Sequence, residues 1–202
     1  TDWRGLLLVL PAILAGLALL EGVVRWSGLG DRVAYNWAYH ERFGWTQVPG
    51  ARYRVELPWG TFAIEFNSDG FRDREHTREK PADITRVVIL GDSFSEALQV
   101  PVEQTYFRLL EQHLNGAGVG RWEVFNFGVG DYGTAQQLRL LIEHVAAYRP
   151  DVIIHQIFPL NDVCNNTLAL AGLCKSTNDR YRPYPVWRNG SIEWQSAEPR
   201  RK

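Results

Sequence analysis

The 202-residue sequence contains no methionine, even at position 1, and its charges are almost balanced. The missing methionine predicts a processed or partial product, whose ends need not be those of the gene. There are 22 basic and 23 acidic residues, giving a net charge of −1. This balance excludes the strongly basic surface typical of nucleic-acid-binding proteins, so no nucleic acid is expected as a partner.

Cysteine is also scarce, since Cys164 and Cys174 are the only two. They close a short loop and are candidates for a disulfide in an oxidising compartment, whereas in the cytosol they are expected to stay free. Internal repeats and low-complexity segments are absent, which leaves one ordinary globular domain with an appendage. We predict no cofactor and no metal site.

The longest apolar run is Gly5 to Val24, with a single charge at Glu21. As a helix it is about 30 Å long, the thickness of a bilayer core. Trp3 and Trp26 flank it as expected of interfacial anchors. The alternative is a cleavable signal peptide with a poor cleavage site. Arginine counts on the two sides are too even to orient a span, and we predict a transmembrane anchor over residues 1–30.

Residues 31–82 are predicted to form a juxtamembrane arm and a β-hairpin. The arm is rich in aromatic residues. Apolar and polar residues then alternate in two runs, 53–57 and 62–66, separated by Pro58-Trp59-Gly60. Alternation of this kind on both sides of a turn is typical of a hairpin with one apolar face.

From residue 83 onward, apolar strands alternate with amphipathic helices. The pattern predicts strands at 87–90, 122–127 and 151–158, with helices at 101–115 and 134–148 between them. Connections of helical length require parallel strands and favour right-handed crossovers. A second hairpin is predicted around Asn189-Gly190.

Polar motifs follow each of the three strands. Gly91-Asp92-Ser93 follows the first, an N-x-G…Y-G-T segment at 126–134 follows the second, and Asn161-Asp162 follows the third. Their order resembles blocks I, II and III of the SGNH (GDSL) hydrolase superfamily. The stretches at 67–72 and 132–137 look especially like its bacterial envelope-facing branch. The similarity covers roughly residues 50–195.

This resemblance implies an α/β fold with a partial flavodoxin-like parallel sheet in three layers. A transmembrane helix and a β-hairpin precede it, and the domain spans residues 83–202 with its C-terminal part missing. The implied chemistry is acyl transfer, with Ser93 as nucleophile and Asn161 as an oxyanion donor. Such a donor contributes roughly 3 kcal/mol of transition-state stabilisation.

Block II and block III depart from the family pattern. The block II glycine aligns with Asp131, whose carboxylate is expected to repel an oxyanion. Gly130 takes over the donor role if the loop shifts by one residue. Pro159 stands where the family has the glycine of G-x-N-D, which alters the turn but leaves Asn161 available.

The general base is the larger departure. The family's late D-x-x-H is absent, and no histidine follows the third strand. Asp73 and His76 have the D-x-x-H spacing but precede the serine, so we expect them in a solvated loop. His113, His144 and His155 fall on predicted helices or a strand and are expected to be structural. Without its base, such a site retains about three to four orders of magnitude over the uncatalysed rate.

Two functional hypotheses remain open. The first is a non-catalytic accessory subunit of a larger membrane complex of the respiratory or photosynthetic type. It would be single-pass in the bacterial inner membrane, with a periplasmic domain. The second is a serine ester hydrolase or O-acyl-modifying enzyme of the cell envelope, whose catalytic Asp and His lie beyond Lys202. The family's outward-facing domains also imply a Cys164–Cys174 disulfide.

Overall fold

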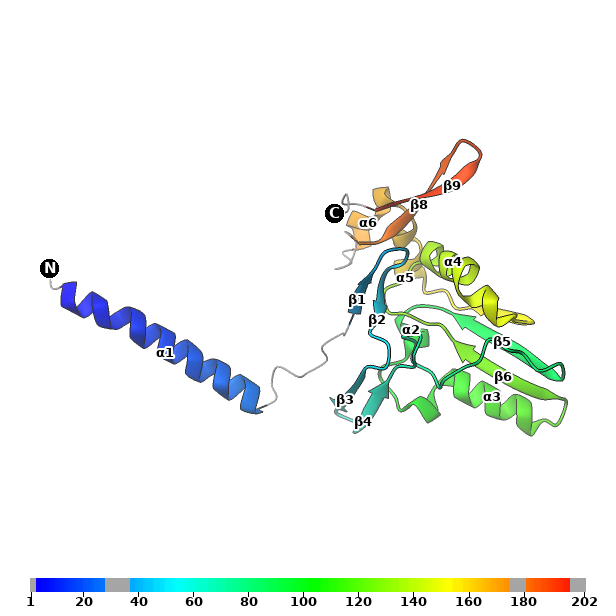
Figure 1. The fold of residues 1–202 in the computed structure, drawn as a ribbon, viewed down its shortest axis with the longest axis horizontal. Helices are drawn as coiled ribbons and strands as arrows, with labels where there is room; N and C mark the ends of the chain where they lie inside the picture. The colour runs from blue at the N-terminus through cyan, green and yellow to red at the C-terminus, as the bar shows by residue number, and fades with distance from the viewer. Residues whose placement is uncertain (1–2, 28–36, 175–180, 197–202) are drawn as a thin grey trace. The chain divides into compact units, whose positions relative to one another are not determined.

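The computed structural model describes the backbone of residues 3–27, 37–174 and 181–196, with side chains for 9–23, 37–171 and 181–195 (Figure 1). The chain divides into two compact units, Thr1–Tyr35 and Asn36–Lys202. The second unit therefore combines the aromatic arm, the first hairpin and the α/β region. Residues 31–36 of the predicted arm lie outside the described residues.

The first unit contains helix α1 (Trp3–Ser27), with Pro11 inside it. Its described side chains, residues 9–23, are all exposed. Within the described part of the chain, we find no helix with the length and apolarity needed to cross a bilayer.

This finding corrects three predictions together. The transmembrane helix over Gly5 to Val24, the single-pass inner-membrane location and the periplasmic placement that formed part of this location are contradicted. The predicted interfacial side chains of Trp3 and Trp26 lie outside the described residues. The predicted parallel α/β part and the predicted hairpin around Pro58-Trp59-Gly60 are present in the structure.

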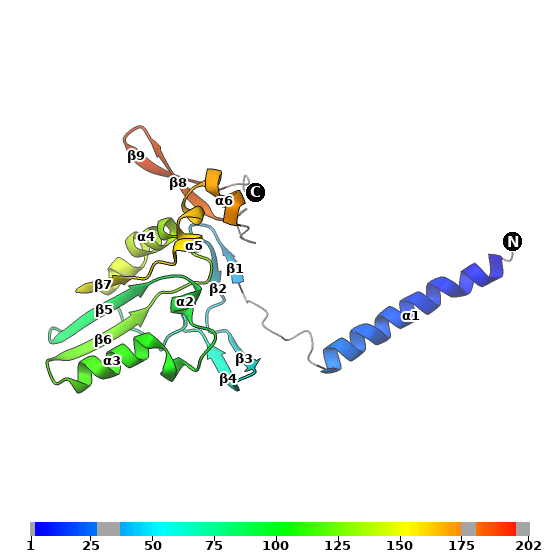
Figure 2. The same ribbon diagram turned by 180° about the vertical axis from the view of Figure 1, so that it is seen from behind.

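The centre of the second unit is a three-stranded parallel sheet in the order β6-β5-β7 (Figure 2). Its strands are β5 (Ile84–Leu90), β6 (Arg121–Asn126) and β7 (Val152–His155). Ile89 pairs with Asn126 and Leu90 with His155, so the three carboxyl ends lie at the same edge. The loops that follow the three strands therefore meet at that edge.

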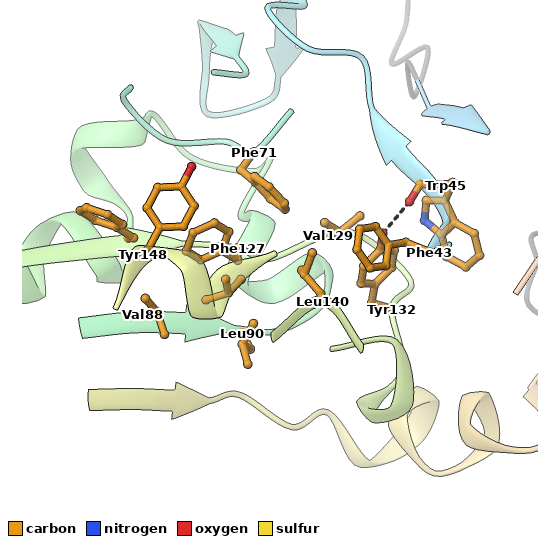
Figure 3. Packing of buried hydrophobic residues seen from close by; sticks show 12 residues of the cluster. Phe43, Trp45, Phe71, Val88, Leu90, Phe127, Val129, Tyr132, Leu140 and Tyr148 are labelled. Carbon is orange, nitrogen blue, oxygen red and sulfur yellow. Dashed lines mark hydrogen bonds between the residues drawn. The ribbon is translucent and has the colours of Figure 1, made fainter. Parts of the chain in front are cut away.

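Helices cover both faces of this sheet: α3 (Tyr106–Gly116) on one, and α4 (Thr134–Glu143) with η2 (Val145–Tyr148) on the other. Alternate residues of β5 point to opposite faces. Val87 and Ile89 pack with Phe107 of α3, whereas Val88 and Leu90 belong to the α4 side. That second cluster is rich in aromatic rings (Figure 3).

The second unit also contains three antiparallel hairpins, each a separate two-stranded sheet. Asn189 and Gly190 both have positive φ, as the tight turn predicted there requires. A further hairpin, β1–β2, forms in the region that we predicted to be a juxtamembrane arm. The strands are β1 (Trp37–His40) with β2 (Gly44–Gln47), β3 (Arg52–Leu57) with β4 (Gly60–Glu65), and β8 (Pro183–Arg188) with β9 (Ser191–Ser196).

Short helices occupy the connections at the carboxyl edge. They are α2 (Ser93–Glu96), η1 (Val102–Gln104), α5 (Pro159–Asp162), η3 (Cys164–Asn166) and α6 (Leu168–Cys174). The described fold is thus mixed α/β, with one small parallel sheet and three hairpins. Two of these short helices, α2 and α5, carry the residues of the candidate site.

Candidate functional site

Ser93 lies at the first turn after β5, where the strand passes directly into α2. Asp92 is the N-cap of α2, and its side chain accepts a hydrogen bond from the Phe94 N–H at 3.0 Å. A Cβ at Gly91 would lie 2.8 Å from the Ser95 Cβ, so a larger residue does not fit this turn unless Ser95 moves. Ser93 is half-buried, and within the described residues its hydroxyl makes no hydrogen bond.

Asn161 is brought to the same turn by α5, the helix that follows β7. Its Nδ2 donates to the Asp92 carboxylate at 2.9 Å, and its backbone N–H donates to the Phe158 carbonyl at 3.2 Å. The Asn161 side-chain oxygen is buried without a hydrogen-bond partner. The structure therefore places both predicted residues next to Asp92, Ser93 as its neighbour along the chain and Asn161 through its hydrogen bond.

Asp162 fixes α5 in place. Its buried carboxylate accepts hydrogen bonds from the Phe158 N–H at 2.6 Å, the Thr134 hydroxyl at 3.1 Å and the Gln137 amide at 3.1 Å. Burial raises the pKa of Asp162, and the hydrogen bonds from the Phe158 N–H and the Thr134 hydroxyl oppose the rise. Asp162 thus ties the loop after β7 to the start of α4, and so positions Asn161 next to it.

Gly130, the alternative donor, has its N–H already engaged. That N–H donates to the Glu96 carboxylate at 3.1 Å, and the Gly130 carbonyl accepts from Trp45 Nε1 at 3.1 Å. In this arrangement Gly130 offers no free N–H to a developing oxyanion. The loop instead ties α2 to the β1–β2 hairpin.

Asp131 adopts a left-handed conformation, with φ +66°, at the position where the family pattern has glycine. Its carboxylate lies 3.1 Å from Nη2 of Arg182, a side chain with no exposed surface. Arg182 Nη1 also donates to the Asp131 carbonyl at 2.7 Å, and Asn165 Nδ2 lies 3.3 Å from the carboxylate. The charge that we expected to repel an oxyanion is therefore compensated by Arg182.

The D-x-x-H pair is buried, contrary to the expected solvated loop. His76 Nε2 lies 2.7 Å from Asp73 Oδ2, and its ring stacks on Phe125 at 3.6 Å between centroids. The same carboxylate accepts the Asn126 N–H at 2.8 Å and forms an ion pair with Arg108. Burial lowers the pKa of His76 to about 4, which favours a neutral ring near pH 7. This network anchors the 71–76 segment to the end of β6.

The other four histidines also lack a role at Ser93. Among the described residues, no hydrogen bond or ring contact joins any histidine to Ser93. His40 accepts from the N–H groups of Arg42 and Phe43, and His113 contacts a carbonyl of its own helix. The remaining two histidines, His144 and His155, likewise make no hydrogen bond or ring contact with Ser93.

Cys164 is disulfide-bonded, while the side chain of its predicted partner Cys174 lies outside the described residues. No cluster of three or more metal-ligating side chains occurs in the described part of the chain. The arrangement around Ser93 contains a hydroxyl, an amide and compensated carboxylates. These groups can carry nucleophilic chemistry once a proton acceptor is present.

Four residues of this region were missed by sequence reasoning: Asp92, Glu96, Gln156 and Arg182. Asp92 lies within the Gly-Asp-Ser motif and is a common N-cap type, which was the available indication. Glu96 and Gln156 are polar residues in apolar surroundings. Nothing local indicated Arg182. Comparisons of the chain with family models, curated proteins and solved structures found no match.

Proposed function

We propose that Ser93 is the nucleophile of an SGNH-type acyl-transfer site that acts on an ester, as a hydrolase or an O-acyl-modifying enzyme. The observation that carries this proposal is the bond between Asn161 and Asp92, which joins the loops after β7 and β5 beside Ser93. The compensated charge of Asp131 adds support, because it removes a source of repulsion.

In this reaction the Ser93 oxygen attacks the ester carbonyl carbon and loses its proton to a base. The carbonyl oxygen becomes an oxyanion, the alcohol leaves with a proton, and Ser93 holds the acyl group until water or another hydroxyl removes it. Asn161 Nδ2 supplies a donor for the oxyanion if it turns from Asp92 to the substrate. The described residues do not place a base at Ser93, so the proposal requires a proton acceptor from elsewhere.

Hydrolysis of p-nitrophenyl acetate by the full chain tests the proposal. We expect turnover that Ser93→Ala abolishes and that Ser191→Ala, a change at an exposed hairpin serine, leaves intact. Equal turnover by the wild type and Ser93→Ala would reject Ser93 as the nucleophile.

A second candidate is a non-catalytic scaffold that serves as an accessory subunit of a larger assembly. The observation that favours it is the placement of all five histidines away from hydrogen-bonding contact with Ser93. This candidate predicts an inert protein that comigrates with a larger complex under native conditions. Turnover lost in Ser93→Ala would exclude it.

A further inference from the structure

Glu96 is a fully buried carboxylate three residues after Ser93, on the same short helix α2. One carboxylate oxygen accepts the Gly130 N–H at 3.1 Å, and the other accepts Gln47 Nε2 at 2.5 Å. Through these two bonds, Glu96 connects the nucleophile's helix to the loop after β6 and to strand β2.

The loop at 128–131 lies directly on α2, and at its two glycines there is no space for a larger residue. A Cβ at Gly128 would come within 2.6 Å of the Glu96 backbone nitrogen. A Cβ at Gly130 would come within 2.7 Å of the Glu96 carboxylate and 3.2 Å of the Trp37 ring. The 128–131 loop and α2 are therefore in such close contact that the Glu96 side chain can hold the loop in position.

The opposite side of the loop is held by the β1–β2 hairpin. Trp45 Nε1 donates to the Gly130 carbonyl at 3.1 Å, and the Tyr132 hydroxyl donates to the Trp45 carbonyl at 2.5 Å (Figure 3). The Trp45 and Tyr132 rings are 5.4 Å apart, edge to face. Gly130 is thus bonded on both sides, and Glu96 provides the one bond to α2 that depends on a titratable group.

We propose that Glu96 is a positioning residue, whose ionised carboxylate holds the Gly130 N–H and so fixes the 128–131 loop relative to Ser93. Protonation of Glu96 weakens this bond, because a neutral carboxyl group is a poorer acceptor than a carboxylate. The consequence for Ser93 chemistry rests on the proposed function, whereas the control of the loop does not.

Charged and titratable groups surround Glu96 from several elements. Arg72 donates to the Glu96 carbonyl, Asp92 precedes it on the α2 turn, and Tyr132 and the Asp131–Arg182 pair lie on the loop side. Burial raises the pKa of Glu96 to about 7, opposed by the bonds from Gln47 and Gly130 and by Arg72.

Gln47 provides a partner for either protonation state. Its side-chain oxygen is buried without a hydrogen-bond partner, while its Nε2 donates to the carboxylate. Rotation of this amide by half a turn would present the oxygen to a protonated Glu96. The site can therefore satisfy both forms of the acid, and only the Gly130 bond weakens.

The test follows the Gly130 amide of the full chain by ¹H–¹⁵N NMR between pH 5 and 9. We expect its resonance to shift with a midpoint near pH 7, and the shift to vanish in Glu96→Gln. Glu123→Gln, which removes a carboxylate paired with Arg86, serves as the matched control and should leave the Gly130 titration unchanged. A Gly130 amide that does not titrate in the wild type would overturn the proposal without any variant.

The same experiment separates this proposal from the proposed function. In Ser93→Ala the Gly130 titration should persist, so an inert Ser93 would remove the acyl-transfer proposal and leave the role of Glu96 standing. A Gly130 amide that titrates equally in the wild type and Glu96→Gln would assign the titration to another group. That result would remove the role of Glu96 alone.

Discussion

Arg182 and Asp131 form an ion pair across 51 residues of sequence, with Nη2 of the guanidinium 3.1 Å from the carboxylate. The Arg182 side chain has no exposed surface, and its guanidinium lies over the Trp45 ring at 4.9 Å. The pair holds the segment before β8 against the loop after β6. It also explains how an aspartate is accommodated where the family pattern has glycine.

Arg182→Ala should destabilise the protein by about 3 kcal/mol, because it leaves the Asp131 charge partly buried without its cation. Asp131→Gly in the same chain should recover part of that loss, since it removes the charge and relieves the left-handed backbone. A double-mutant cycle in urea should therefore give a coupling energy of about 1–3 kcal/mol. Additive effects would show that the ion pair makes no contribution.

The free energy of unfolding should depend on pH through the ionisation of Glu96. Its pKa is raised to about 7 in the folded protein from 4.5, so folding favours the protonated acid. The resulting stabilisation is complete below pH 4.5 and is lost as the pH rises through 7, a change of about 3 kcal/mol.

Glu96→Gln should remove that part of the pH dependence and be relatively more stable than the wild type at pH 8. Urea unfolding at pH 5 and pH 8 measures the difference for each protein. Identical pH dependence in the two proteins would contradict the buried, shifted carboxylate.

His76 should be dispensable for chemistry at Ser93. His76→Gln loses the stacking on Phe125 and weakens the bond to Asp73, which should reduce stability by about 1–3 kcal/mol. The rate of ester hydrolysis per folded molecule should stay unchanged. A loss of turnover in a fully folded variant would instead make His76 the base.

Asn161 should matter for the reaction more than for stability. Asn161→Ala removes one donor and should lower kcat about 100-fold, while costing about 1 kcal/mol of stability. Gln99→Ala, a change at an exposed residue that follows α2, is the control. Equal effects of the two variants on kcat would rule out a donor role for Asn161.

Much of the fold could be predicted because local pattern determines it. The apolar run at 87–90 and the later runs predicted three strands, and the helical length of the connections predicted that they are parallel, whereas the order β6-β5-β7 is seen only in the structure. The turn at Asn189-Gly190 was likewise predictable from two residues that tolerate positive φ. The predicted membrane span at the N-terminus is wrong, because no helix in the described part of the chain is long and apolar enough to cross a bilayer.

The site could be predicted only in part, because its support comes from distant segments. Ser93 and Asn161 follow strand ends, and the parallel sheet brings such positions together. Glu96 reaches Gln47 across 49 residues, and Asp131 reaches Arg182 across 51. Neither pairing has a local pattern, so the sequence indicated an isolated Asp131 where the fold provides a cation.

The most direct test of the account is whether Ser93 reacts covalently as a nucleophile. The full chain is treated with an alkyl fluorophosphonate, and the intact mass and the modified peptide are measured by mass spectrometry. We predict a single adduct on Ser93 that is absent in Ser93→Ala. An unmodified wild-type protein, or an adduct that persists in Ser93→Ala, would contradict the assignment of Ser93 as the nucleophile.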